Sequence, residues 1–268
     1  MNLLPEFYEG VLPAEKMVES RRDLTFFSLG SGYSVVIACD SDGGIGNKEQ
    51  DMVRVDNRLT GYFGTRVPLM EVLSALGRPF LLIDTLSVEM KPAGTEIIAG
   101  IKKACTEAGL LRLPITGSTE ENIPTVQTGI GVTVLAIVKD DQIPVGSSQE
   151  GDLVAVAGIP KSGPRFKVEP EDPEIISLDD LLRLRDISGV HDILPVGSKG
   201  VAFEAEELAR TAGLHWRRAP GNGLDLQRSG GPSTCVVFSL AGSRALQAVK
   251  ATINAPVCTV GELYGGGK

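Results

Sequence analysis

Apolar runs rich in β-branched residues alternate along this chain with segments of helical periodicity. Five runs have the length and composition of strands, at 33–39, 80–88, 131–138, 152–159 and 233–241. Four amphipathic segments predict helices, at 66–77, 94–109, 177–188 and 199–213, and three of them end at a glycine suited to a helix C-terminus. Alternating strands and helices predict an α/β or α+β protein.

A polar, turn-rich stretch, KDDQIPVGSSQEGD at 139–152, separates two of the predicted strands. Such stretches commonly mark domain boundaries, because few contacts cross them. We therefore expect two domains, 1–145 and 146–268. The chain has 268 residues, of which 42% are hydrophobic, so both domains have material for a core.

The charge balance limits the partners of the chain. A formal charge of −8 would on average repel a nucleic-acid backbone or an anionic membrane. The acidic N-terminal segment has no basic start followed by an apolar stretch, so we do not expect a secretory signal. No apolar run approaches the roughly 18 residues of a membrane span. The expectation is a soluble, cytoplasmic protein that binds neither nucleic acid nor membrane.

The cysteines point to no metal site or disulfide framework. Cys39, Cys105, Cys235 and Cys258 are far apart and form no C-x-x-C pair. Their apolar or mixed surroundings predict reduced, buried thiols. Cys39 is the one reservation, because it adjoins a loop with several polar residues.

That loop reads CDSDGGIGNK and follows the apolar run 33–39. Gly43, Gly44 and Gly46 would let the backbone approach an anion closely, and Lys48 would add a positive charge. The loop matches neither the Walker pattern nor G-x-G-x-x-G. A charged hairpin turn is the competing interpretation, since strands are often joined by such sequences.

Carboxylates near this loop are candidate Mg²⁺ ligands. Asp40, Asp42 and Asp51 are possible here, since Mg²⁺ usually binds one or two carboxylates together with substrate phosphates. Asp84 lies in the middle of the apolar strand 80–88, where an unpaired carboxylate is costly. It is interpreted either as an ion-paired or capped residue or as a metal ligand. The loop 114–129 is either a Mg²⁺ or ribose contact or a solvated surface loop.

The sequence contains two histidines, which leaves few candidates for catalysis by histidine. His191 lies between glycine and aspartate and is the better candidate for a catalytic group. His215 adjoins Trp216 and is expected to serve packing or the surface. A structural hydrogen bond is the alternative for His191.

In order and spacing, several segments resemble aminoimidazole ribonucleotide (AIR) synthetase and its relatives. IACDSDGGIGNK is similar to that family's Asp-Gly-Val-Gly-Thr-Lys loop, and 65–89 is similar to its helix-then-strand block. ITGSTEEN stands where the family has Gly-Gly-Glu-Thr. The passages 150–166, 189–213 and 231–263 resemble its C-terminal motifs. The set most resembles short AIR-synthetase-related proteins associated with α-ribazole kinase.

This resemblance to the AIR-synthetase-related (PurM-like) superfamily implies a two-domain fold and a homodimer joined through its N-terminal sheets. It also implies ATP and Mg²⁺ bound by acidic loops of the N-terminal domain. Three departures argue against AIR synthetase itself: Ser118 replaces the acidic ligand of Gly-Gly-[DE]-Thr, Lys161–Phe166 loses an asparagine, and Lys199 enters a double-glycine motif. A different phosphate acceptor would fit these changes.

The leading hypothesis is an ATP- and Mg²⁺-dependent kinase acting on a hydroxyl of a nucleoside-like substrate, with α-ribazole preferred. An AIR-synthetase-like cyclo-ligase and a non-catalytic nucleotide-binding regulatory protein are the alternatives. Phosphoryl transfer needs positioning and charge neutralisation more than covalent help. The assigned residues are Lys48, Asp42 and His191 for catalysis; Gly43, Gly44, Gly46, Asn47 and Lys48 for the nucleotide; and Asp40, Asp42, Asp84 and Glu120 for the metal.

Overall fold

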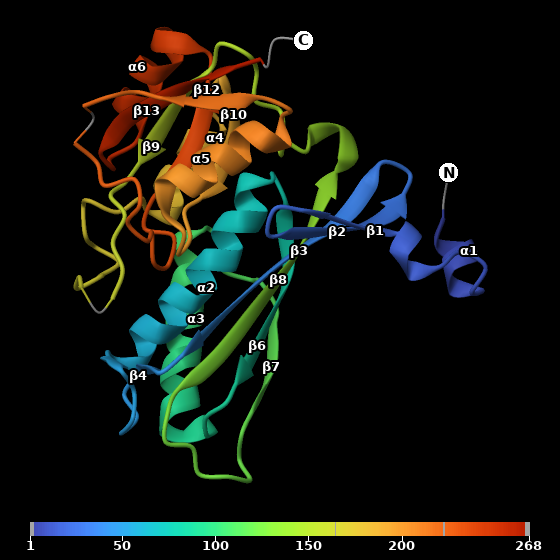
Figure 1. Cartoon of the computed structure of the whole chain (residues 1–268). Coiled ribbons are helices and arrows are strands. Elements are labelled where there is room, and N and C mark those ends of the chain that lie inside the picture. The colour runs from blue at the N-terminus through green and yellow to red at the C-terminus, as the bar shows by residue number, and fades with distance from the viewer. Residues whose placement is uncertain (1–2, 164, 222, 266–268) are drawn as a thin grey trace. The chain divides into compact units, whose positions relative to one another are not determined.

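The structure is a computed structural model that describes residues 3–163, 165–221 and 223–265. It confirms a mixed α/β fold and contains two compact units, Met1–Ile143 and Pro144–Lys268 (Figure 1). The sequence placed the division after residue 145.

Unit 1 is built on a six-stranded sheet with the order β1-β2-β3-β8-β6-β7. Neighbouring strands are antiparallel except β6 and β7, which are parallel. The strands are β1 Val18–Arg21, β2 Leu24–Gly30, β3 Tyr33–Gly43, β6 Arg78–Leu86, β7 Ile115–Thr119 and β8 Gly129–Lys139. A separate parallel pair, β4 Ile45–Gly46 and β5 Val53–Arg54, follows β3.

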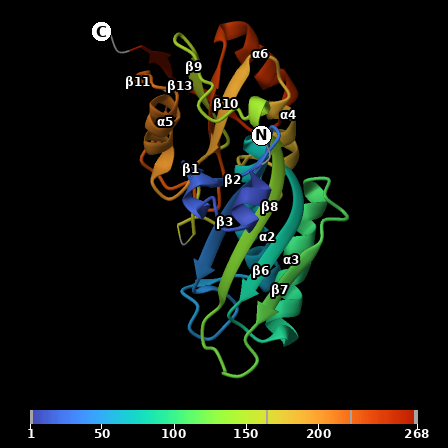
Figure 2. The same ribbon diagram turned by 90° about the vertical axis from the view of Figure 1, so that its right-hand side faces the viewer.

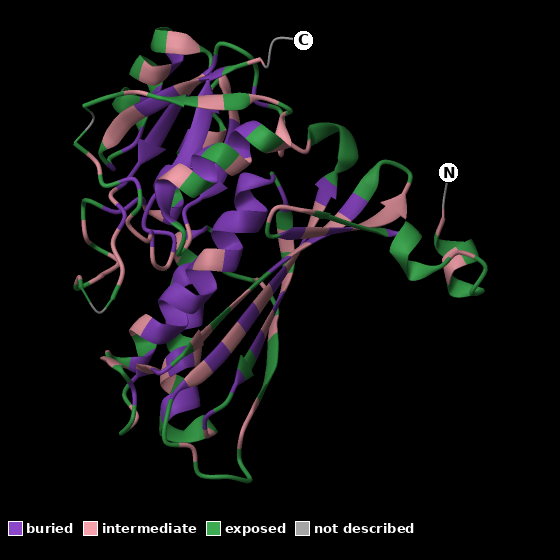
Figure 3. Ribbon diagram, viewed as in Figure 1, coloured by how far each residue is buried: buried purple, intermediate pink, exposed green. Residues whose placement is uncertain are grey.

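Helices α2 (Asn57–Ser74) and α3 (Thr95–Glu107) pack against each other and cover one face of this sheet (Figure 2). Strict alternation of buried and partly exposed residues along β8 shows which face they cover (Figure 3). The short helix α1 (Leu4–Tyr8) contacts β2 through the rings of Phe7 and Phe27, whose centroids lie 5.6 Å apart. The buried side chains of the sheet therefore face α2 and α3, and the partly exposed side chains lie on the opposite face.

Two glycines bring α2 and α3 unusually close. A Cβ at Gly61 of α2 would lie 2.0 Å from the carbonyl oxygen of Ile97, and one at Gly100 of α3 would lie 2.0 Å from that of Arg58. Neither position has room for a side chain. The helices therefore touch backbone to backbone where the two glycines face each other's turns.

Unit 2 contains a five-stranded antiparallel sheet with the order β10-β12-β9-β13-β11. Helix α5 lies on one side of it, and α4 and α6 lie on the other (Figure 2). All residues of β12 are buried, as expected for a strand covered on both faces. The elements are β9 Leu153–Ala157, α4 Leu178–Arg185, β10 Val190–Pro195, α5 Gly200–Thr211, β11 His215–Arg218, β12 Val236–Leu240, α6 Gly242–Thr252 and β13 Val257–Tyr264.

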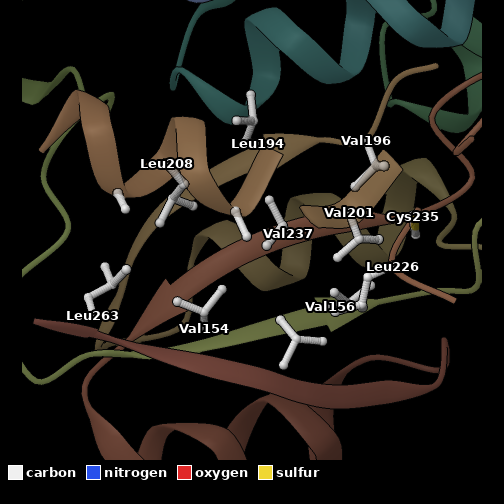
Figure 4. Close-up of a cluster of buried hydrophobic side chains, with 13 residues drawn as sticks. Val154, Val156, Leu194, Val196, Val201, Leu208, Leu226, Cys235, Val237 and Leu263 are labelled. Carbon is white, nitrogen blue, oxygen red and sulfur yellow. The ribbon is translucent and has the colours of Figure 1, made fainter. Parts of the chain in front are cut away.

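The core of unit 2 between α5 and the sheet is aliphatic. Val154 and Val156 of β9 and Val237 of β12 meet Val201 and Leu208 of α5 (Figure 4). Each of these side chains is fully buried, and such burial stabilises the fold by roughly 1.5–3 kcal/mol per side chain. The sheet and helix of unit 2 thus share a continuous apolar contact.

The expectation of buried thiols is only partly correct. Cys105 and Cys235 are buried, Cys258 is partly exposed and Cys39 is exposed. Cys39 is exposed because it lies on β3 with its side chain on the face that α2 and α3 leave open, between the inward-facing Ala38 and Asp40. Within the described residues, no helix is long and apolar enough to cross a membrane.

Candidate functional site

The glycine-rich loop predicted from the sequence begins where β3 ends. Gly44 has a φ of +71°, a left-handed conformation that glycine adopts without strain. Its N–H donates to the carbonyl of Thr128 at 2.8 Å, and the N–H of Gln50 donates to Val126 at 2.9 Å. The loop 43–51 therefore lies along the segment that leads into β8.

Asp51 anchors this loop. Its carboxylate accepts hydrogen bonds at 2.7 Å each from the N–H of Lys48, the N–H of Thr128 and the hydroxyl of Thr128. The side chain is buried, with 7% of its surface exposed. Three donors occupy its oxygens, so Asp51, a possible cation ligand by sequence, instead joins the loop to the start of β8.

The predicted phosphate-binding glycines differ in their surroundings. A Cβ at Gly46 would lie 2.3 Å from the Thr128 hydroxyl, so packing alone requires glycine there. Gly43, by contrast, has open space around the position of a Cβ. Gly43 is the better placed of these two to admit an anion close to the backbone.

Lys48 has a partner that the sequence did not reveal. Its ammonium forms an ion pair with Glu89, and the Lys48 side chain is 15% exposed. Burial opposes ionisation of Glu89, but the hydrogen bond and charge of Lys48 outweigh it and lower the pKa of that carboxyl. A phosphate would have to exchange with Glu89 to reach this ammonium. Asn47 is held by its backbone N–H, which donates to the Asn57 side chain at 3.2 Å.

Asp40 and Asp42 form an acidic pair on β3. They are two residues apart, so both point to the helix-covered face. Burial raises the pKa of Asp40 above its ordinary value. Burial, followed by the charge of Asp40, raises the pKa of Asp42 to about 6. A Cβ at Gly64 of α2 would lie 3.1 Å from an oxygen of Asp42, which places that carboxyl against the helix.

Asp84 lies apart from this pair. It and Asp40 are both in register with Val132 of β8, one on each side, so a whole strand separates them. Asp84 is 4% exposed and lines a pocket between β6, β7 and α3. One of its oxygens, Oδ2, is buried without a hydrogen-bond partner in the structure. The ion pair or helix cap that would explain a buried aspartate is thus lacking for this oxygen.

Glu120, the fourth predicted metal ligand, folds back on its own loop. Its carboxylate accepts from the N–H of Asn122 at 2.7 Å and from that of Ile123 at 3.2 Å. The neighbouring Glu121 accepts from the N–H of Met90 at 2.7 Å. Glu120 therefore stabilises the turn that follows β7, and Glu121 ties that turn to Met90; the residues in place of Gly-Gly-[DE]-Thr, 116–119, belong to β7 itself.

His191 belongs to unit 2, on the edge strand β10. Its Nδ1 lies 2.7 Å from a carboxylate oxygen of Asp152, a residue with 3% of its surface exposed. The same oxygen accepts the N–H of Gln149 at 2.8 Å. Asp152 thus orients the imidazole of His191. Such a contact is expected both for a structural histidine and for one that transfers a proton.

Two of the four predicted metal ligands lie where they could hold Mg²⁺. No group of three or more His, Cys, Asp or Glu side chains in the described chain is gathered closely enough to hold a metal. Mg²⁺ needs only one or two carboxylates when phosphates complete its shell, and the paired Asp40 and Asp42 offer hard oxygens of that kind. A cation there would also offset their mutual repulsion. The complete four-residue set stays a prediction, as do the catalytic and nucleotide-binding assignments.

Sequence reasoning missed Asp51, Thr128 and Glu89 as the residues that shape the loop. Thr128 comes three residues before the strand predicted at 131–138, and Glu89 directly after the one predicted at 80–88. Their location at strand ends was a usable signal, because strand ends of one sheet meet at an edge. The pairing itself depends on strand order, which the sequence did not reveal.

No protein-family profile and no curated protein matches this sequence. Several solved structures share its fold. Thiamine-monophosphate kinase from Aquifex aeolicus superimposes over 100% of this chain and 95% of its own, with a TM-score of 0.63 and 14% identity. The kinase of that name from Stenotrophomonas maltophilia K279a covers 99% and 94%, with a TM-score of 0.60 and 15% identity. Hydrogenase maturation protein HypE from E. coli covers 86% and 80%, with a TM-score of 0.62 and 14% identity.

At these identities the comparison concerns the fold alone. The similar structures include kinases and a maturation protein, which are different activities on one architecture. Both units of the chain take part in the match to the A. aeolicus protein, since it covers the full length. The fold expected from the sequence motifs, that of the AIR-synthetase-related (PurM-like) proteins, is the fold of this chain.

Proposed function

We propose that this chain is an ATP- and Mg²⁺-dependent kinase that phosphorylates a hydroxyl group of a nucleoside-like substrate, α-ribazole by preference. The observation that carries the proposal is the ordered loop 43–51, which follows directly on the acidic pair Asp40 and Asp42. Proteins of the same fold support it through what they bind: a thiamine-monophosphate kinase complexed with AMPPCP and TMP, and HypE and T. maritima PurL, each complexed with ATP.

The acidic pair and several residues of the loop have separate roles in this proposal. Asp40 and Asp42 would hold Mg²⁺, which neutralises phosphate charge during transfer. The exposed backbone at Gly43, with the Asn47 side chain, would hold phosphate oxygens, while the Gly44 N–H keeps its bond to Thr128 and shapes the turn. Lys48 would leave Glu89 for a phosphate.

The transfer forms a bond between the acceptor oxygen and the γ-phosphorus while the bond to the bridging oxygen breaks, and ADP leaves. The acceptor proton needs a base. Asp42, whose pKa is about 6 in the metal-free chain, would accept this proton where Asp40 alone holds Mg²⁺. His191, held by Asp152, is the second proton-transfer candidate and requires the substrate to reach unit 2.

A non-catalytic nucleotide-binding role is the second candidate. The separation of Asp84 and Glu120 from Asp40 and Asp42 favours it, because the chain then offers fewer metal ligands than the resemblance implies. A cyclo-ligase is the third reading carried over from the sequence.

Calorimetry with MgATP, followed by a transfer assay with α-ribazole read by mass, tests the proposal. We expect binding, ADP formation and a product heavier by one phosphoryl group. Lys48→Met should weaken MgATP binding about tenfold or more, whereas Lys139→Met, an exposed lysine at the end of β8, should not.

The other possible results of these two measurements distinguish the alternative functions. Binding without transfer to any riboside would replace the kinase by the regulatory protein. Free phosphate together with a cyclised product would replace it by the ligase. If the native protein does not bind MgATP, all three readings are wrong.

A further inference from the structure

Lys48 and Glu89 form an ion pair between the loop 43–51 and the segment that leads from β6 to α3. The two side chains are 15% and 34% exposed, so water and salt screen the pair only in part. Burial opposes ionisation of Glu89, yet the hydrogen bond and the charge of Lys48 keep the pKa of its carboxyl below the ordinary value. The ammonium proposed for a phosphate is therefore occupied by a carboxylate of the chain itself.

The backbone is held on both sides of this ion pair. The N–H of Lys48 donates to the buried carboxylate of Asp51 at 2.7 Å. The carbonyl of Glu89 accepts from the N–H of Gly94 at 2.9 Å, and the residues that follow Glu89, 90–92, are exposed. Rotation of the Glu89 side chain toward solvent is enough to release the ammonium. The pair can thus open while the loop and the start of α3 stay in place.

Opening the pair leaves Glu89 charged in acidic surroundings. Between residues 40 and 51 the sequence places one ammonium, that of Lys48, among four carboxylates: Asp40, Asp42, Glu49 and Asp51. A bare polyphosphate that takes Lys48 would meet this excess of negative charge and the released Glu89 as well. Like charges repel most where burial limits screening. A divalent cation that arrives with the phosphates offsets this repulsion.

We propose that Glu89 makes anion binding at Lys48 depend on a divalent cation. Glu89 first holds the ammonium, and once displaced it is a negative charge that the cation of the ligand has to offset. Glu89 thereby selects phosphates that carry their metal over bare polyphosphates and simple anions. This role of Glu89 rests on the proposed function, because it takes Lys48 as a phosphate contact.

The competing interpretation is that the ion pair only ties the loop to the segment before α3. Loss of the Glu89 charge would then loosen the loop and weaken the binding of every anion there. A selecting Glu89 has the opposite effect, because its loss frees Lys48. One substitution therefore separates the two interpretations by the sign of its effect.

The test measures pyrophosphate binding to the full chain by calorimetry, in EDTA and in Mg²⁺, and requires neither an acceptor nor turnover. We expect Mg²⁺ to tighten binding to the native chain at least tenfold. Glu89→Gln keeps the size of the side chain and removes its charge. Metal-free pyrophosphate should bind this variant at least tenfold more tightly than the native chain, and binding should depend on Mg²⁺ several times less.

The matched control is Glu49→Gln. Glu49 is exposed and adjoins Lys48 in the sequence, so the substitution removes an equal charge near the same ammonium. We expect it to change the metal-free affinity less than threefold, because Lys48 keeps its ion pair with Glu89.

A second measurement follows Lys48 without any phosphate. Acetylation by limiting acetic anhydride, read from peptide masses, should be slower at Lys48 of the native chain than at the exposed Lys139. In Glu89→Gln the rate at Lys48 should rise at least threefold, and the rate at Lys139 should stay the same. If Glu89→Gln does not fold by circular dichroism, Glu89→Asp replaces it. Its shorter side chain should change both measurements in the same direction by a smaller factor.

The proposal is overturned if the Glu89 variant binds metal-free pyrophosphate no more tightly than the native chain, or if Glu49→Gln tightens binding as much. It is also overturned if none of the chains binds pyrophosphate. The kinase proposal is decided separately. Transfer by the native chain with an unchanged Mg²⁺ dependence in Glu89→Gln would remove only the role of Glu89. The expected pyrophosphate results without any transfer would remove only the kinase.

Discussion

Asp42 is an ionisable residue whose surroundings disfavour its charged form. It lies against α2 at Gly64 and close to Asp40, and both burial and that neighbour raise its pKa to about 6. A folded-state pKa above the unfolded value means that the folded chain binds the proton more tightly. Ionised Asp42 therefore destabilises the fold above pH 6, and the penalty disappears as the pH falls below the ordinary value of 3.8.

Asp42→Asn should accordingly stabilise the protein at neutral pH. We expect the free energy of unfolding at pH 7.5, in chelator, to rise by roughly 1–3 kcal/mol. The gain should shrink through pH 6 and vanish near pH 4. Urea denaturation across this range measures it, with Asp141→Asn, an exposed aspartate, as control. An equal gain at all pH values would show that burial of the charge is not the cause.

At the residue scale, sequence reasoning found the polar residues but not their partners. Lys48 was assigned to a phosphate because lysine after glycines suits one, yet the structure pairs it with Glu89. These two residues are 41 positions apart. Only the fold, which brings the end of β6 beside the loop, creates that pairing. A pattern along the chain carries no information on it.

At the scale of elements, the contact between α2 and α3 depends on Gly61 and Gly100. Glycine weakens an isolated helix by about 1 kcal/mol relative to alanine. Here it permits backbone contact, since a side chain at either position would collide with a carbonyl of the facing helix. The lost helix propensity is offset by closer packing.

Gly61→Ala should destabilise unit 1 despite improving helix propensity. Overpacking of a tight contact costs about 1–3 kcal/mol, and here the obstacle is backbone, so we expect the upper end or more. Chemical denaturation followed by circular dichroism provides the measurement. Gly43→Ala, where a Cβ meets open space, should change stability by less than about 0.5 kcal/mol. Equal effects of the two substitutions would contradict this account of the helix contact.

The start of α2 is an error in the sequence prediction. The helix expected at 66–77 begins at Asn57, after Asp56, whose side chain caps it by accepting the N–H of Arg58 at 2.8 Å. Gly61 and Gly64 lie in the part of the helix that was not predicted, and their places are set by tertiary contacts, Gly61 against α3 and Gly64 against Asp42 and Ile130 of the sheet. The strands predicted at 33–39 and 131–138 were correct, since each alternates cleanly on a sheet with one covered face.

Short and irregular strands were not predicted. β7, Ile115–Thr119, consists largely of exposed, hydroxyl-bearing residues and glycine, so it lacks an apolar pattern. It forms because β6 offers it a parallel partner. Strands of this kind are fixed by pairing rather than by composition, and the pocket beside Asp84 was missed with it.

At the scale of the whole molecule, the second face of the six-stranded sheet is the feature that needs a partner. Ile37 of β3, Leu135 of β8 and Leu81 of β6 lie in one register row on that face and are partly exposed. Tyr33, on the same face of β3, is 42% exposed. Contiguous apolar surface of this kind commonly marks an association site. We propose that it joins a second copy of the chain, as the resemblance implies.

Ile37→Asp should therefore disrupt a dimer. We expect sedimentation of the native chain to give twice the monomer mass of 28.3 kDa, and that of the variant to give the monomer mass. A buried, unpaired charge at an interface costs several kcal/mol, enough to dissociate a micromolar dimer. Val11→Asp, at a site 72% exposed and outside the sheet, should leave the mass unchanged. A monomeric native chain at micromolar concentration would remove the proposal.

Asp51 has a consequence for the thermodynamics of any ligand at the loop. Its three hydrogen bonds hold Lys48 and Thr128 in the folded chain and so fix the loop 43–51 against the start of β8. The conformational entropy of these residues is thus lost before a ligand arrives, and association need not order them again. In the proposed nucleotide site, an entering anion would replace Glu89 at Lys48, and the backbone would already be in place.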